Sequence, residues 1–134
     1  MERGIDLNAD EGARRDLLLS RPVIAVVGRS DKPDSVSYAV GRYLEDHGFT
    51  IYNVNPRVSE VDGKPSYASL KDIPASVDIV DVFRKSEFLP EIVDEAIAVG
   101  AKTVWGQLGV TNDEARQQAL AAGLNYADDI CIRA

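Results

Sequence analysis

The stretch VIAVVGRSDKPDSVSY (23–38) joins an apolar run to a helical pattern through a loop suited to phosphate. Gly28 opens this loop, and backbone N–H groups and the dipole of the following helix would attract an anion there. Arg29 and Lys32 add positive charge to the same loop. A dinucleotide-binding G-x-G-x-x-G turn needs two further glycines, which this loop lacks. The stretch therefore predicts a site for an anionic ligand other than NAD.

A second polar group follows the next β-rich run, IYNV (51–54). NAD sites usually place Asp or Glu there to bind the ribose 2′-hydroxyl, whereas this chain has Asn55, Pro56 and Arg57. A cation at that position suits a phosphorylated ribose. NADP carries such a phosphate on the 2′ carbon and coenzyme A carries one on the 3′ carbon, and the missing glycines count against NADP.

Short apolar runs and helical patterns alternate along most of the chain. The runs cover 23–27, 51–54, 77–82 and 102–105. Apolar strands that alternate with helices favour a parallel sheet covered on both faces. The sequence therefore predicts one α/β domain with a doubly wound, mainly parallel, Rossmann-like sheet. The proline- and glycine-rich link 55–78 predicts little more than an edge strand and one helical turn.

Three helices are predicted between these runs. The first begins after Ser35 and ends at Gly48, the second begins near Ser86 and ends at Gly100, and the third runs from about Asn112 to Gly123. The predicted buried face of the first helix consists of Val36, Ala39, Val40, Tyr43 and Leu44. Residues 1–20 are expected to form an N-terminal arm or short helix, and residues 21–134 the domain itself.

Composition narrows the possible functions. The net charge of −7 argues against binding to nucleic acid, which relies on basic residues. The lone Cys131 and the lack of a His/Cys cluster argue against an internal disulfide or a metal site. No apolar run is long enough for a membrane span or signal peptide, so we expect a cytoplasmic protein without membrane contact.

In open α/β sheets, ligands bind beyond the carboxyl ends of the strands, where the strand order reverses. FRKS follows the third run and GQLG follows the fourth, so both are expected at that edge. Arg84 or Lys85 could instead pair with Glu87 or Glu91. Asp81, inside the third run, is expected to be a hydrogen-bonded structural carboxylate.

Several of these runs together match a known family. VIAVVGRSDKPDSVSYAVGRYLEDHGFTIYNVNPR, GKPSYASLKDIP, VDIVDVFRKSEFLPEIVDEAI and GAKTVWGQLGV closely resemble the small stand-alone CoA-binding proteins. These are similar in turn to the CoA-binding domain of the succinyl-CoA synthetase alpha subunit. The resemblance covers about residues 22–132 and implies a Rossmann-like domain that binds coenzyme A.

The resemblance also assigns roles to the strand-end loops. It implies that Gly28, Ser30 and Lys32 lie under the CoA phosphates. It implies that Pro56 and Arg57 lie near the adenosine and its 3′-phosphate. The FRKS loop would border the pantetheine, and the GQLG loop would form its far wall. The complete set of predicted CoA-binding residues is Gly28, Arg29, Ser30, Lys32, Ser37, Tyr38, Asn55, Pro56, Arg57, Phe83, Arg84, Lys85, Gln107, Leu108 and Gly109.

The expected function is non-catalytic binding of CoA or an acyl-CoA. An unidentified protein partner could recognise the ligand-bound state. The histidine that the ligase phosphorylates belongs to a second domain and has no match here, so ligase activity is not implied. No nucleophile and base stand out as catalytic residues. An NADP-linked reductase or a transferase acting on the CoA thioester is the alternative. A structural subunit with a vestigial pocket is a third possibility.

Overall fold

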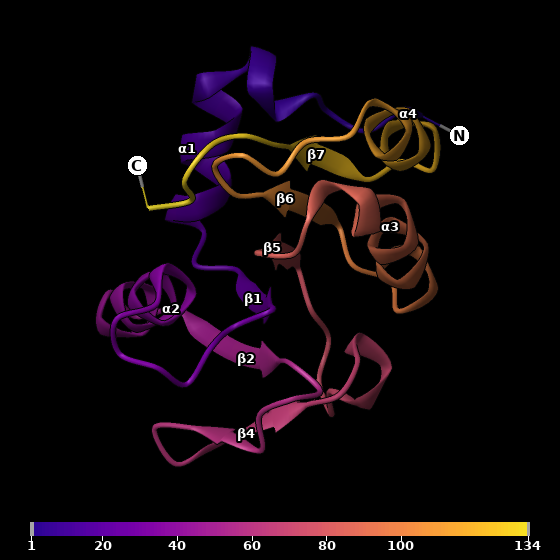
Figure 1. Ribbon diagram of the computed structural model, residues 1–134. Helices are drawn as coiled ribbons and strands as arrows, with labels where there is room; N and C mark the ends of the chain where they lie inside the picture. The colour runs from indigo at the N-terminus through magenta and orange to yellow at the C-terminus, as the bar shows by residue number, and fades with distance from the viewer. Residues whose placement is uncertain (1, 134) are drawn as a thin grey trace.

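A seven-stranded sheet with helices on both faces makes up the computed structural model, which describes residues 2–133 (Figure 1). The strand order is β3-β4-β2-β1-β5-β6-β7, and every neighbouring pair is parallel except β3 with β4. This arrangement confirms the predicted doubly wound α/β fold. The strands are β1 (Val23–Val27), β2 (Thr50–Val54), β3 (Glu60–Val61), β4 (Lys64–Tyr67), β5 (Ile79–Val82), β6 (Thr103–Gly106) and β7 (Asn125–Ala127). The helices are α1 (Glu11–Leu19), α2 (Val36–Asp46), α3 (Leu89–Ala98) and α4 (Asp113–Ala121), with short 3-10 helices η1 (Leu7–Ala9), η2 (Leu70–Asp72) and η3 (Ser86–Phe88).

The period of two along each strand divides the apolar side chains between two cores. In β1, Ala25 and Val27 pack with α3 and α4, whereas Ile24 and Val26 pack with α1 and α2. Figure 1 shows α2 on one side of the sheet and α3 and α4 on the other. Because both faces of the sheet are covered, nearly every residue of the inner strands is buried.

Helix α2 begins and ends where the sequence predicts, but its buried face differs. Ser35 precedes the helix, and Gly48 follows it with a φ of 87°. The buried residues are Ser37, Val40, Gly41 and Leu44, while Val36 is 65% exposed. Tyr43 is also exposed, at 37%, so the prediction that Val36 and Tyr43 belong to the buried face is wrong. The inner face of the helix carries the small residues Ser37 and Gly41, because the long side chain of Arg29 from the preceding loop occupies the space beneath Gly41.

The link between β2 and β5 holds the predicted edge strand and helical turn, together with one further short strand. β3 and β4 form a hairpin through Asp62 and Gly63, whose φ angles are 51° and 81°. An Asp-Gly pair with two positive φ angles is typical of a tight two-residue hairpin turn. Strand β7, with only three residues, was not predicted from the sequence.

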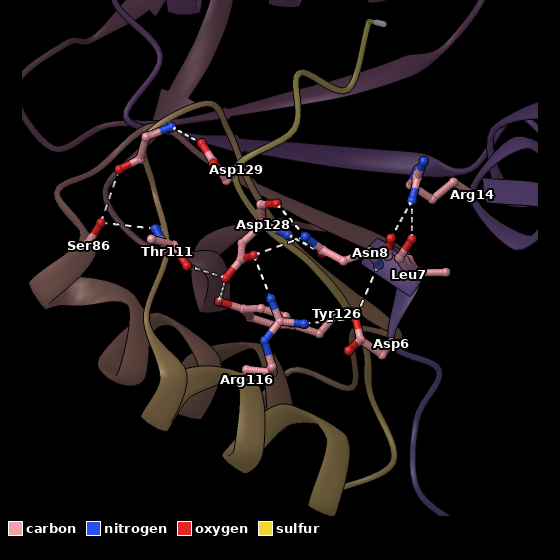
Figure 2. Close-up of polar contacts among 11 residues, drawn as sticks. Asp6, Leu7, Asn8, Arg14, Ser86, Thr111, Arg116, Tyr126, Asp128 and Asp129 are labelled. Carbon is pink, nitrogen blue, oxygen red and sulfur yellow. Dashed lines mark hydrogen bonds and ion pairs between the residues drawn. The ribbon is translucent and has the colours of Figure 1, made fainter. Parts of the chain in front are cut away.

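A polar cluster around Asp128 ties the N-terminal segment to the end of the sheet (Figure 2). One oxygen of the buried Asp128 carboxylate lies 2.6 Å from the Arg116 guanidinium, which also binds Asp6 at 2.8 Å. The other oxygen accepts hydrogen bonds from Thr111 at 2.7 Å and Tyr126 at 3.0 Å. One carboxylate therefore joins helix α4, strand β7 and the segment before η1.

Asp81 departs from its prediction. Both of its carboxylate oxygens are buried, and neither has a hydrogen-bond partner among residues 2–133, so the expected hydrogen-bonded role is wrong. Burial, with a smaller effect from nearby Cys131, raises the pKa of this carboxyl well above its ordinary value of 3.8. The neutral acid is favoured because an unpaired charge in the core would lose its hydration.

Asp81→Asn is expected to stabilise the protein at neutral pH. Between the unfolded and the raised folded pKa, only the folded chain keeps the proton, so the free energy of unfolding falls as pH rises through that window. The fall is up to about 1.4 kcal/mol per pH unit. Asn resembles the neutral acid and removes this dependence. Urea unfolding at about pH 4 and about pH 7 measures the free energy of unfolding of the variant and of wild type, and Asp31→Asn, at an exposed residue, is the control. An equal stability difference between Asp81→Asn and wild type at both pH values would contradict the prediction.

Candidate functional site

A cleft of about 630 Å³ opens at the carboxyl ends of β1, β2 and β5. The chain passes from β1 to β2 and β4 on one side, then returns to β5 on the other side of β1. The cleft therefore lies at the point where the strand order reverses, which is the usual ligand position in such sheets. Its lining consists of Val27, Gly28, Val54, Asn55, Pro56, Arg57, Ala68, Ser69, Phe83, Arg84, Lys85, Phe88, Glu91, Ile92 and Glu95.

Gly28 begins the loop that leaves β1 and forms the floor of the cleft. Its N–H donates to the carbonyl of Val54 at 2.7 Å, and its φ of 89° lies in the left-handed region. A Cβ at this position would sit 3.4 Å from Cγ of Arg84. Glycine is needed here because other residues are strained at such a φ and would narrow the cleft.

The loop after β2 presents Arg57 at the cleft. The Asn55 side chain fixes this loop from two directions, since its Nδ2 donates to the carbonyl of Arg29 at 3.0 Å and its Oδ1 accepts from the Arg57 N–H at 3.0 Å. The Arg57 residue is exposed, and no ion pair holds its guanidinium among the described residues. Its charge is therefore available to a ligand.

Two more cations, Arg84 and Lys85, and two carboxylates, Glu91 and Glu95, also line the cleft. The Arg84 guanidinium stacks on the Phe88 ring, 4.3 Å from its centroid. In the part of the chain that the structure describes, neither Arg84 nor Lys85 forms an ion pair, so the alternative pairing with glutamate is not observed. Glu91 and Glu95 line the wall formed by α3, and burial and the charge of Glu91 raise the pKa of Glu95.

The loop from Gly28 to α2 is closed by its own hydrogen bonds. The N–H of Ser30 donates to the Ser37 hydroxyl at 2.9 Å, and the N–H of Lys32 donates to the Ser30 hydroxyl at 3.0 Å. Ser35 and Ser37 share a further hydroxyl contact at 2.9 Å. These groups lie beside the cleft rather than in its lining, and the Lys32 side chain is exposed.

Arg29 lies in the interior instead of facing the cleft. Its side chain is fully buried, and its guanidinium binds Asn53 at 2.8 Å, Glu45 at 3.2 Å and the carbonyl of Tyr38 at 3.3 Å. The sequence prediction placed this cation opposite a ligand phosphate. The structure commits it to protein partners instead, because the small inner face of α2 leaves room for it.

Four other predicted residues also lie outside the cleft lining. The Tyr38 hydroxyl donates to Asp62 of the β3–β4 turn at 2.8 Å. Gln107 is buried, and its Oε1 accepts from the N–H of Ile132 at 3.0 Å. Leu108 and Gly109 are exposed in the loop before α4. The structure therefore brings together Gly28, Asn55, Pro56, Arg57, Phe83, Arg84 and Lys85.

Sequence reasoning missed the lining contributed by the last residues of β1 and β2, by η3 and α3, and by the segment before η2. Those residues are Val27, Val54, Ala68, Ser69, Phe88, Glu91, Ile92 and Glu95. The α3 members could have been found, because a helix that follows a parallel strand begins at the same edge of the sheet. Residues 68–69 gave no such signal, since their place depends on how the irregular link folds back.

Two features are absent from residues 2–133. No helix in this range is long and apolar enough to cross a membrane. The same range holds no group of three His, Cys, Asp or Glu side chains placed to bind a metal ion.

Comparison with known proteins identifies the family to which the chain belongs. The chain is 38% identical over 126 residues to the uncharacterized protein YneT of Bacillus subtilis, covering 94% of this chain and 93% of YneT. It is 28% identical over 123 residues to subunit alpha of the ADP-forming acetate–CoA ligase I of Pyrococcus furiosus, but it spans only 27% of that subunit. A hypothetical protein from Pyrococcus horikoshii has a solved structure with a TM-score of 0.89 and 38% identity, covering 99% of this chain and 94% of that one. A domain family described as the CoA binding domain matches residues 22–134, so the chain belongs to this family of CoA-binding domains.

Proposed function

We propose that the protein binds coenzyme A or an acyl-CoA in the cleft at the carboxyl ends of β1, β2 and β5. The observation that carries this proposal is the convergence of a glycine floor with three exposed cations, Arg57, Arg84 and Lys85, in one cleft. The chain as a whole carries a net charge of −7, so a local excess of cations is unusual here. Such a site favours a ligand with several phosphates.

The charges divide the cleft into two parts. On the side of β2, Gly28 and Arg57 meet no carboxylate in the lining, so this side would hold the phosphates and the ribose. On the side of α3, Phe88 and Ile92 lie beside Glu91 and Glu95. Arg84 and Lys85 offset these two carboxylates, so this side offers an anion less net positive charge than the side of β2 does, whereas the neutral, amide-containing pantetheine arm would find apolar contacts and hydrogen-bond acceptors. The two parts together match the chemistry of CoA.

Catalysis is not part of the proposal. The cleft lining contains a single hydroxyl residue, Ser69, and that hydroxyl donates to Asp72 at 2.9 Å. Neither His47 nor Cys131 belongs to the lining. The match covers only 27% of the ligase subunit that the chain resembles, so the reaction of that subunit is not carried over to this chain.

CoA is expected to bind more tightly than NADP or NAD. The reason is the single-glycine loop and the cation after β2, which suit the ribose 3′-phosphate of CoA. Isothermal titration with CoA, acetyl-CoA, NADP and NAD at one salt concentration measures the order of affinities. NADP binding at least as tight as that of CoA would overturn the proposal and favour the reductase alternative.

A further inference from the structure

Arg29 is a fully buried charged side chain in the loop that follows β1, and it packs against α2. Its guanidinium reaches Asn53 in β2, Glu45 in α2 and the carbonyl of Tyr38. Glu45 in turn binds Lys64 of β4 at 2.9 Å. The Arg29 Nε has no partner among the described residues. A buried cation is costly unless it is paired, and here Glu45 and Asn53 supply the pairing, which fixes the guanidinium against α2 and the end of β2.

The space for Arg29 depends on Gly41. A Cβ at Gly41 would lie 2.4 Å from Nε and 2.5 Å from Cζ of Arg29, closer than any real contact. Glycine in the middle of a helix is unfavourable relative to alanine, and here its benefit is the room it leaves for the guanidinium. Gly41 therefore helps to define the position of the Arg29 guanidinium.

A short chain of hydrogen bonds leads from Arg29 to the cleft. The carbonyl of Arg29 accepts from the Asn55 side chain at 3.0 Å, and the same side chain accepts from the N–H of Arg57 at 3.0 Å. Asn53, two residues earlier in the chain than Asn55, holds the guanidinium. The Arg29 side chain is thus connected to the Arg57 loop through Asn53 and the end of β2. The main-chain carbonyl of Arg29 is connected to the same loop through the Asn55 side chain.

We propose that Arg29 is a positioning residue that holds the Arg57 backbone in place and thereby sets the preference for a ligand with a ribose 3′-phosphate. The proposal rests on the proposed function, in which Arg57 meets that phosphate. The proposal predicts that disturbing Arg29 affects the two ligands CoA and dephospho-CoA differently. When the chain of contacts is disturbed, discrimination between CoA and dephospho-CoA is lost, while binding of the rest of the ligand remains.

Gly41→Ala is the test, because Gly41 does not line the cleft and its new methyl group must displace Arg29. The ratio of the dephospho-CoA and CoA dissociation constants is expected to fall about three- to tenfold, whereas the dissociation constant of dephospho-CoA stays within about twofold of wild type. Asn55→Ala cuts the same chain nearer the cleft and is expected to act in the same direction. Gly12→Ala in α1 is the matched control, since its Cβ would make only an ordinary 3.5 Å contact with Asp10.

The outcomes separate this proposal from the one on which it rests. Thermal unfolding shows which variants are folded, and a merely structural role would weaken both ligands equally and leave their ratio unchanged. If wild type binds CoA in preference to dephospho-CoA and a folded Gly41→Ala protein keeps that preference, the positioning role of Arg29 is overturned while the proposed function stands, whatever Asn55→Ala does, because Asn55 itself lines the cleft. If wild type binds neither ligand, the proposed function itself fails.

Discussion

Arg57→Ala is expected to weaken CoA binding about ten- to hundredfold, the loss of one charge-assisted hydrogen bond. The loss should be specific to the 3′-phosphate. Dephospho-CoA lacks this group, so it should bind wild type more weakly than CoA does, and it should bind Arg57→Ala and wild type about equally. Titration of both ligands into both proteins forms a double-mutant cycle in which the ligand is one partner.

Arg15→Ala is the matched control for this cycle, because Arg15 is also exposed but lies on α1. It removes the same charge from the protein and should leave both affinities unchanged. Rising salt should reduce the advantage of CoA over dephospho-CoA, since Arg57 is exposed to solvent. A folded Arg57→Ala protein that still discriminates between the two ligands as wild type does would place the 3′-phosphate elsewhere, with Arg84 and Lys85 as the next candidates.

Asp128→Asn is expected to lower the free energy of unfolding by about 3 kcal/mol, as is typical when one partner of a buried ion pair is removed. Its carboxylate lies 2.6 Å from Arg116 and accepts from Thr111 and Tyr126 (Figure 2). An amide carries no charge and replaces one of the two acceptor oxygens with an NH2 group, so the pairing with Arg116 or the acceptor for Thr111 and Tyr126 is lost. The midpoint of thermal unfolding should fall by roughly 10 °C.

Asp129→Asn is the control, because it makes the same chemical change at the next residue, which is exposed, and because the amide oxygen of Asn can still accept the 2.8 Å hydrogen bond from the Gly109 N–H. We expect it to change stability by less than about 0.5 kcal/mol. Hydrogen exchange locates the effect of Asp128→Asn, which should be largest at the N–H groups of Gly4 and Tyr126, where the N-terminal segment meets α4 and β7. Equal stability of the two variants would show that the Asp128 cluster contributes nothing to the fold.

The elements of the doubly wound sheet could be predicted from the sequence because their signals are local. Gly48, Gly100 and Gly123 each follow a helix with a positive φ, as their positions suggested. The short strand β7 could not be predicted, because its three residues carry no pattern of their own. It becomes a strand by pairing with β6, and an isolated bridge joins Asp6 of the N-terminal segment to its Tyr126.

The cleft was predictable in part for the same reason. Parallel strands end at one edge of a sheet, so the residues after β1, β2 and β5 had to lie near one another, and seven of the fifteen predicted residues line the cleft. The loop after β6 ends at the same edge, but it does not line the cleft. Gln107 binds the backbone near the C-terminus instead, a contact between residues 25 apart that no local pattern reveals.

The sequence by itself determined how the four main strands and the three helices between them follow one another along the chain. It also determined the edge of the sheet where the loops gather and the cationic character of those loops. What only the tertiary structure decided is which cations face the ligand. Arg29 and Arg57 are both arginines that follow a β-rich run. Arg29 is buried because Gly41 leaves room for it and because Glu45 and Asn53 pair with its charge, whereas Arg57 has no such partner and stays in solvent. The direction of a side chain depends on the volume and charge that other segments place around it, and only the folded chain brings those segments together.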